Sequence, residues 1–157
     1  MKKIKFIVVD RTRSSFLKRG ELFFLDRLKN YSKMEWHEVK PVRIIKGVNQ
    51  EEIKKKEGLA IGIKLSVDDY VVALDRKGQQ FDSEELADWL AKVTSITRGS
   101  ICFIIGGPLG LSKEILDRAD KILSLSKLTF THEMCRLFLI EQVYRSFTII
   151  RGEKYHK

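Results

Sequence analysis

A short apolar run that ends directly in glycines constrains the fold of this chain more than any other feature. Ile101–Ile105 (ICFII) is continuous and apolar, which is typical of a fully buried strand. Gly106–Gly110 (GGPLG) predicts a tight loop, and an amphipathic helix follows from about Ser112. Because α/β proteins hold ligands at the carboxyl ends of their strands, this loop is a candidate binding site. A plain strand-to-helix turn would use the same residue types, so local sequence leaves both interpretations open.

The loop lacks the common nucleotide-binding patterns. It contains neither the GxxxxGKS/T of a phosphate-binding loop nor the GxGxxG of a dinucleotide-binding turn. No glycine-rich turn follows the first predicted strand, where a dinucleotide-binding fold would place one. A conventional ATP or NAD site is therefore not expected.

Strands and helices alternate along the chain. Apolar strands are predicted at Ile4–Val9, Glu35–Ile45, Tyr70–Leu74 and Ile101–Ile105, the third followed by a turn at Asp75–Gly78. Helices are predicted from Ser14 or Ser15, from the capping-box spacing at Asn49, from Asp82 or Ser83, from Ser112 through Leu123, and from about His132 to Thr148. The alternation indicates an α/β fold, with a mostly parallel sheet covered by helices on both faces. We expect a single domain spanning 1–157.

The last predicted helix is apolar almost all round, with Leu137, Phe138, Val143 and Phe147 among its members. Such a helix needs burial on more than one side. We therefore expect a homodimer that forms through it.

The charge balance favours a polyanionic partner. Thirty lysines and arginines against 21 acidic residues give a net charge of +9, which fits nucleic acid or an anionic membrane surface as well as an ordinary basic protein. The triplet Lys54–Lys56 is typical of a solvated helix face, although it could add to an electrostatic footprint.

The sequence predicts no membrane span, signal peptide or metal site. No apolar run approaches the roughly 18 residues of a membrane span, and the start of the chain does not continue into a signal peptide. Cys102 and Cys135 lie far from any CxxC spacing and are expected to be reduced core thiols of a cytoplasmic protein. No cluster of His, Cys, Asp or Glu has metal-ligand spacing, so no metal is predicted.

Four segments, taken in order, are similar to those of one bacterial family. They are Ile104–Leu111, Leu125–His132, Glu141–Arg145 and the terminal Tyr155–His156, and Leu74–Gly78 with Ser83–Ala87 also looks like its middle segment. The family that they resemble is the ribosomal RNA large-subunit methyltransferase H family of the SPOUT superfamily. The resemblance extends over essentially the whole chain, and the four motifs in order are more specific than any one of them.

The resemblance implies a C-terminal deep trefoil knot, a homodimer as the working unit and S-adenosylmethionine as cofactor. The substrate implied is a pseudouridine, at position 1915 in helix 69 of 23S rRNA within the assembled ribosome, methylated at N3. A non-catalytic RNA-binding or ribosome-binding protein that has kept a SPOUT-like fold is the alternative, and methylation of a different RNA site also stays open.

The matching positions imply a set of site residues. Cofactor binding falls on Leu74, Gly106, Leu125, Ser126, Lys127, Leu128, Thr129 and Phe130. An apolar slot with free backbone groups suits adenine, and glycine lets the chain approach closely. Candidate catalytic residues are His156, Tyr155, Arg145 and Glu141, and candidate RNA contacts are Arg136, Arg151 and Lys154.

Structural alternatives accompany these roles. Glu141 and Arg145 have the spacing of an i,i+4 ion pair, and the last residues of a chain are often a frayed tail. Two positions also depart from the family pattern. Thr131 replaces a proline that many relatives carry, and it can cap the last helix instead. Asp10–Thr12 stands where many relatives have a glycine, which weakens the expectation of an RNA contact there.

Overall fold

The structure is a computed structural model that describes all residues, 1–157. Strands and helices alternate from β1 to α5, as the sequence predicts. In chain order the elements are β1 (Lys3–Val9), α1 (Ser15–Leu28), β2 (Lys33–Val39), α2 (Gln50–Gly62), β3 (Tyr70–Gln79), α3 (Ser83–Ile96), β4 (Ile101–Ile105), α4 (Lys113–Arg118), β5 (Lys121–Leu123) and α5 (His132–Ile150).

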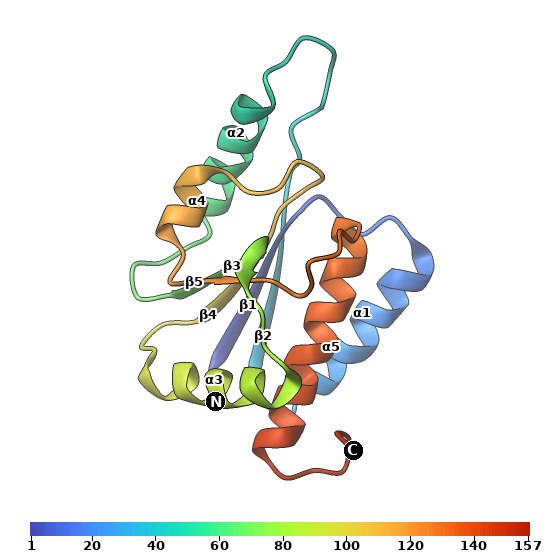
Figure 1. Cartoon of the computed structure of the whole chain (residues 1–157), viewed down its shortest axis with the longest axis vertical. Coiled ribbons are helices and arrows are strands. Elements are labelled where there is room, and N and C mark those ends of the chain that lie inside the picture. The colour runs from blue at the N-terminus through green and yellow to red at the C-terminus, as the bar shows by residue number, and fades with distance from the viewer.

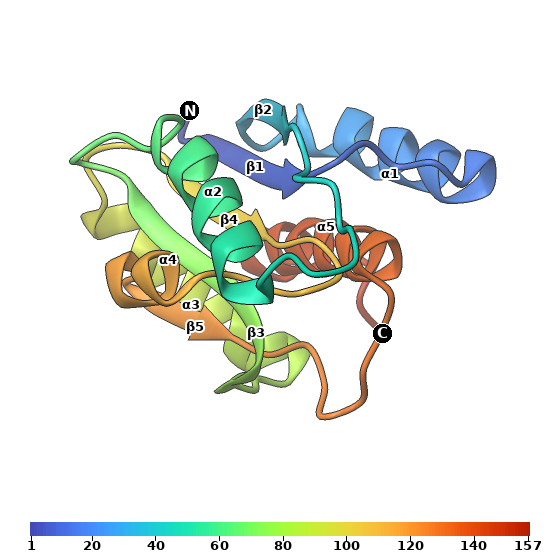
Figure 2. The same cartoon turned by 90° about the horizontal axis from the view of Figure 1, so that it is seen from above.

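The five strands form one sheet in the order β2-β1-β4-β3-β5, and every pair is parallel. Helices cover both faces of this sheet (Figures 1 and 2). The alternation of side chains along β1 shows the layering. Phe6 and Val8 belong to a core shared with α1, α3 and α5, whereas Ile7 and Val9 belong to a core shared with α2 and α4. The predicted α/β architecture is confirmed.

The predicted end of the helix after Ser112 is wrong. The helix expected to run from Ser112 through Leu123 ends at Arg118, and Lys121–Leu123 is instead an edge strand beside β3. The Asp120 N–H donates to Val71 O at 2.8 Å, and the Val71 N–H donates back to a carboxylate oxygen of Asp120 at 2.7 Å. This edge pairing is a tertiary effect, which local helical periodicity cannot reveal.

The turn expected at Asp75–Gly78 is also wrong, because β3 continues to Gln79 with a register shift between Leu74 and Gln79. The chain passes very close to β5 here, and a Cβ on Gly78 would lie 2.7 Å from the backbone of Ile122. A glycine that permits close backbone approach resembles a turn glycine in sequence.

The other differences are smaller. β2 ends at Val39 rather than Ile45, two residues before Pro41, which has no N–H to donate to a ladder. The expected caps Asn49 and Asp82 precede α2 and α3, and Asp82 forms a full capping box with Glu85. Thr131 caps α5 by accepting a hydrogen bond from the Met134 N–H, as predicted. None of the helices is both long and apolar enough to cross a bilayer.

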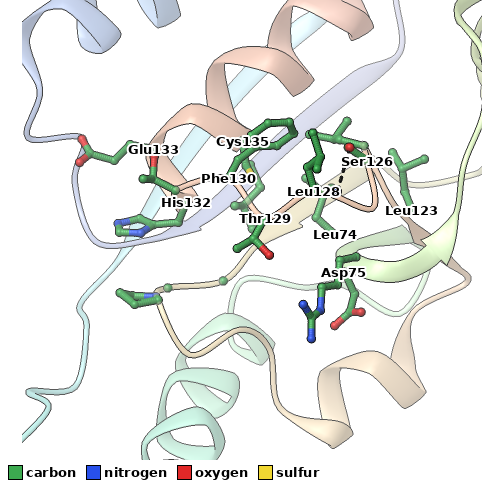
Figure 3. A pocket seen from close by; sticks show the side chains of 17 residues that line it. Leu74, Asp75, Leu123, Ser126, Leu128, Thr129, Phe130, His132, Glu133 and Cys135 are labelled. Atoms are coloured by element: carbon green, nitrogen blue, oxygen red, sulfur yellow. Dashed lines mark hydrogen bonds between the residues drawn. The ribbon is translucent and has the colours of Figure 1, made fainter.

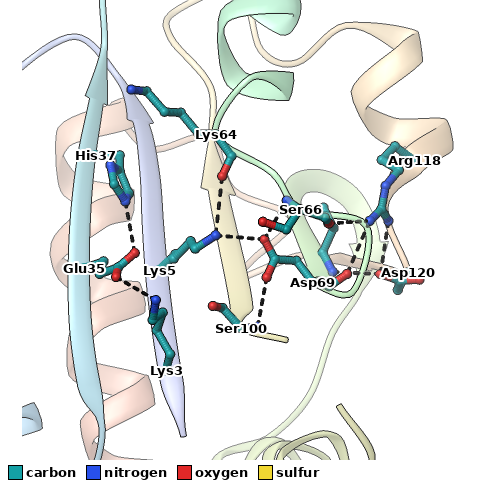
Figure 4. Close-up of polar contacts among 11 residues, drawn as sticks. Lys3, Lys5, Glu35, His37, Lys64, Ser66, Asp69, Ser100, Arg118 and Asp120 are labelled. Carbon is teal, nitrogen blue, oxygen red and sulfur yellow. Dashed lines mark hydrogen bonds and ion pairs between the residues drawn. The ribbon is translucent and has the colours of Figure 1, made fainter. Parts of the chain in front are cut away.

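A buried ion pair fixes the amino-terminal edge of the sheet (Figure 4). Lys5 Nζ on β1 donates to a carboxylate oxygen of Asp69, which directly precedes β3, at 2.8 Å. The same carboxylate accepts from the backbone N–H groups of Ser66 and Ser100, each at 2.8 Å. Burial alone would raise the pKa of Asp69, but these hydrogen bonds outweigh it and hold that pKa at about 2.

We predict that Asp69 makes folding sensitive to acid. Because its pKa is lower in the folded state, its contribution is present above about pH 4 and is lost as the pH falls towards 2. Asp69→Asn should destabilise the protein at pH 7 by about 3 kcal/mol, since it leaves Lys5 buried without a counter-charge. Urea unfolding between pH 7 and pH 2 measures both effects. An acid dependence that is equally steep in Asp69→Asn would contradict the assignment.

Candidate functional site

A pocket of about 660 Å³ opens at the carboxyl-terminal edge of the sheet (Figure 3). Its size is typical of small-molecule sites. Its lining comes from three segments far apart in sequence, namely the middle of β3, the loop after β4 and the chain from the end of β5 into α5. The lining residues are Leu74–Arg76, Ile105–Pro108, Leu123, Leu125, Ser126, Leu128–Glu133 and Cys135.

The glycine loop after β4 forms one wall of the pocket. Gly110 adopts a φ of 85°, which favours glycine, and its N–H donates to Gly107 O at 3.0 Å to close the turn. A Cβ on Gly106 would lie 2.8 Å from the carbonyl carbon of Gly110, so no larger residue fits there without moving the backbone. The loop is therefore tighter than a plain strand-to-helix connection requires.

The segment 124–130 forms the opposite wall, and side chains hold its backbone. Ser124 Oγ donates to Ser126 O at 3.0 Å, and Ser126 Oγ accepts from the Leu128 N–H at 3.0 Å. Leu128 is 70% exposed at the rim of the pocket. The neighbouring N–H groups of Lys127, Thr129 and Phe130 donate no hydrogen bond within the chain. This wall thus combines apolar side chains with unused backbone donors.

Seven of the eight residues expected to bind a cofactor line this one pocket. They are Leu74, Gly106, Leu125, Ser126, Leu128, Thr129 and Phe130. Lys127 is the exception, because its side chain is exposed and not part of the lining. In Figure 3 the leucines Leu74, Leu123 and Leu128 gather on one side and His132 lies on the other.

The first turn of α5 supplies pocket residues that sequence reasoning missed. His132 and Glu133, which are not among the expected site residues, both line the cavity. Burial lowers the pKa of His132, and the nearby Arg136 charge lowers it further. A carboxylate oxygen of Glu133 accepts from the Ser14 N–H at 3.1 Å and so ties α5 to the loop after β1. The position of His132 at the end of the segment Leu125–His132, which carries part of the family resemblance, was the available signal.

The prediction that Arg136 contacts RNA is wrong. Its side chain is 0% exposed and donates to Val9 O at 2.5 Å and to Thr12 Oγ1 at 3.0 Å. Thr12 in turn donates to Glu21 Oε1, and that glutamate is also fully buried. Arg136 therefore joins α5 to the end of β1 and to α1, and it has no surface to offer a nucleic acid.

The structure explains how Asp10 can stand in the segment where many relatives have a glycine. Asp10 adopts a φ of 71°, the region that favours glycine and that aspartate tolerates better than most residues. Its carboxylate accepts from the Arg11 N–H at 2.8 Å and forms an ion pair with Arg13 at 3.1 Å. The aspartate thus keeps the turn that a glycine would permit, and it stabilises that turn through local hydrogen bonds.

The four candidate catalytic side chains lie together, two on the second half of α5 and two on the tail that follows it. Arg145 Nη2 donates to Glu141 Oε1 at 2.6 Å, which is the expected i,i+4 ion pair. The Tyr155 hydroxyl donates to the same oxygen at 2.9 Å, and the Arg145 guanidinium lies 4.7 Å from the centre of the Tyr155 ring. His156 Nδ1 is 3.3 Å from Arg145 Nη1. The tail is therefore docked on α5 rather than frayed.

This C-terminal cluster is separate from the pocket. None of its four members lines the cavity, whose last lining residue is Cys135. At 1.5 Å per residue, Glu141 lies roughly 9 Å and Arg145 roughly 15 Å further along the helix axis. The other candidate RNA contacts are close to the tail. Lys154 is exposed, and Arg151 is exposed with its guanidinium 4.5 Å from the Tyr31 ring centre.

An apolar pocket at the carboxyl ends of parallel strands defines the class of α/β proteins that bind nucleotide-like ligands at this edge. The family model described as "Predicted SPOUT methyltransferase" matches residues 1–156. The chain is 40% identical to the ribosomal RNA large subunit methyltransferase H of Bacillus pumilus, over 98% of this chain and 99% of that protein. It is 42% identical to the protein of the same name from Halothermothrix orenii, over 99% of both. The chain therefore belongs to the ribosomal RNA large subunit methyltransferase H family of SPOUT methyltransferases.

Solved structures share the fold at low sequence identity. A probable methyltransferase from Bordetella pertussis superposes with a TM-score of 0.57 at 11% identity, covering 92% of this chain and 94% of that one. A probable methylase family protein from Haemophilus influenzae gives a TM-score of 0.51 at 16% identity, covering 97% of this chain and 67% of the other. At these identities the likeness is evidence for the fold alone.

We predict that Arg136 contributes to stability far more than the half-buried Arg145 on the same helix. Arg136→Met should cost about 3 kcal/mol, because it leaves Val9 O and the Thr12–Glu21 pair without their buried donor. Arg145→Met should cost about 1 kcal/mol or less, since it removes one partly exposed ion pair. Urea unfolding of the two variants measures the difference. Equal, small losses would argue that Arg136 has no structural role.

Proposed function

We propose that this protein transfers a methyl group from S-adenosylmethionine to N3 of a pseudouridine in helix 69 of 23S rRNA, within the assembled ribosome. The observation that carries the proposal is the gathering of seven expected cofactor residues around one pocket in a member of a methyltransferase family. The relatives' names specify an rRNA of the large subunit. The particular base and its N3 atom come from the family resemblance. A ribosomal substrate also leads us to propose a cytoplasmic protein.

The pocket residues fit S-adenosylmethionine. Leu74, Leu125 and Leu128 offer an apolar slot of the kind that adenine occupies, and a cavity of about 660 Å³ has room for the whole molecule. The unused N–H groups of Thr129 and Phe130 are available to read the adenine edge or the ribose. When bound, the cofactor supplies a sulfonium methyl group, which is intrinsically electrophilic.

The protein's own task is then to orient the base and to accept a proton. N3 of pseudouridine carries a proton that must leave as the methyl group arrives. We assign proton acceptance to His156 or Glu141, stacking on the base to Tyr155, and stabilisation of an ionised base or a phosphate to Arg145. Exposed Arg151 and Lys154 lie near these residues and are the proposed phosphate contacts.

We infer a homodimer in which the C-terminal cluster of one protomer completes the pocket of its partner. The separation of the two sites along α5 supports this arrangement, because a single protomer does not bring them together. Exposed aromatic side chains on α1 and α5 offer an apolar surface for such pairing, with Phe16 62%, Phe23 49% and Phe138 38% exposed.

We also propose that the C-terminal part of the chain is threaded as a deep trefoil knot, as the family resemblance implies. The chain leaves β5 at the edge of the sheet and returns through the segment 124–131 to pack α5 between α1 and α3, against β4 (Figure 1). A trefoil knot requires in addition that this part of the chain passes through a loop formed by an earlier segment.

The function is tested by mass spectrometry of 23S rRNA. Deleting the gene should remove one methyl group from a pseudouridine in helix 69, and restoring the gene should return it. Purified protein should also bind S-adenosylmethionine in calorimetry. If 23S rRNA from the deletion strain and from the complemented strain has the same mass in helix 69, the proposal is contradicted. No binding at millimolar cofactor would favour the alternative, a ribosome-binding protein without catalytic activity.

The shared active site is tested by mixing two inactive variants. Thr129→Trp, at an exposed position of the pocket lining, should obstruct the pocket, and a tail variant with Tyr155→Ala and His156→Ala should lack the proposed base-handling groups. Co-expressed in equal amounts, they should recover about a quarter of wild-type activity, since half of the dimers would hold one intact site of two. Purification through two different tags isolates the mixed dimers. Mixed dimers as inactive as either variant would contradict sharing between protomers.

A further inference from the structure

The connection between β2 and α2, residues 40–48, extends beyond the carboxyl-terminal edge of the sheet (Figure 1). We call it the 40–48 loop. Lys40, Arg43 and Lys46 on this loop are all exposed, and none of their side chains forms an ion pair. With the first turns of α2, residues 40–56 carry six basic and two acidic side chains. The loop is thus a concentrated, uncompensated source of positive charge.

Two apolar side chains stand between the cations of this loop. Ile44 is 55% and Ile45 is 53% exposed, between Arg43 and Lys46. The Val48 N–H donates to Ile45 O at 3.2 Å, so Ile45 begins a hydrogen-bonded turn and Ile44 directly precedes it. A solvated charged face has no reason to hold adjacent isoleucines at its tip, whereas a contact surface does.

The base of the 40–48 loop is fixed to the wall of the pocket. Glu57 on α2 is 5% exposed, and its Oε1 accepts from the Val42 N–H at 3.2 Å. Its other carboxylate oxygen lies 3.6 Å from where a Cβ on Gly107 would stand, so the same side chain adjoins the glycine loop. Figure 2 shows the two loops side by side at this edge. A ligand large enough to cover the pocket mouth would also meet the 40–48 loop.

We propose that the 40–48 loop is a second RNA-docking surface, in which Arg43 and Lys46 bind phosphates and the isoleucine pair packs on an exposed base or sugar. The inference rests on the proposed rRNA substrate and extends it to a surface outside both the pocket and the C-terminal tail. Folded RNA combines regularly spaced phosphates with apolar base faces in loops and bulges. Alternating cations and apolar side chains match that combination better than they match an acidic protein surface.

The test compares two double variants in binding to vacant ribosomes at several salt concentrations. Arg43→Ala with Lys46→Ala should weaken binding about tenfold at physiological salt and lower the slope of log K against log salt by about 2. Lys33→Ala with Lys64→Ala removes two exposed lysines at the amino-terminal edge of the sheet and should change neither quantity. A loop variant within twofold of this control would overturn the proposal.

A second pair of measurements tests the apolar contact and the identity of the partner. Ile44→Ser with Ile45→Ser should weaken binding several-fold with an unchanged salt slope, and no loss would refute the packing of the pair. Ile45→Cys carrying a photo-crosslinker should label 23S rRNA. The crosslinker should attach to the introduced thiol in preference to the two native thiols, because burial raises the pKa of both, that of Cys102 to about 12. Crosslinks to ribosomal protein alone would overturn an RNA partner.

The failures of the two proposals are distinguishable. Cofactor affinity of the loop variants, measured by calorimetry, should stay within twofold of wild type, because no mutated side chain lines the pocket. If the wild-type protein binds and methylates ribosomes while the loop variant equals its control, the docking surface alone is refuted. If the wild-type protein methylates no rRNA, the proposed function is refuted first.

Discussion

Parallel pairing of all five strands is the constraint from which the site follows. It brings the glycine loop after β4, the middle of β3 and the chain after β5 to the same edge of the sheet. Gly106 lets the start of the glycine loop lie against the backbone of Gly110, Gly110 adopts a φ that favours glycine, and the leucines of 123–128 close the apolar side. The pocket is therefore a consequence of strand direction combined with one close backbone approach at Gly106 and one positive φ at Gly110.

The placement of α5 depends on a buried polar connection rather than on apolar contact alone. The Arg136 guanidinium donates to the end of β1, and Glu133 accepts from the turn that follows it. These contacts hold the first turn of α5, which carries His132, against the mouth of the pocket. A guanidinium without solvent exposure is costly unless it is hydrogen-bonded, so this connection specifies one position for the helix.

Much of the fold and of the pocket could be predicted from the sequence, and the errors share a physical cause. Continuous apolar runs such as Ile101–Ile105 identify buried strands directly, and the caps Asp82 and Thr131 are local signals that the structure confirms. The short edge strand β5 was missed because its pairing with β3 is a tertiary contact. Arg136 was misread for a similar reason, since nothing local distinguishes a buried arginine from a surface one.

Hydrogen exchange of the main-chain amides, with and without S-adenosylmethionine, tests the central claim most directly. If the pocket holds the cofactor, the amides of Lys127, Thr129 and Phe130, which have no partner within the chain, should exchange more slowly when it is bound. Amides at the amino-terminal edge, such as Ser100, should be unaffected. Unchanged exchange across 125–130 at saturating cofactor, or protection confined to another part of the chain, would contradict the account.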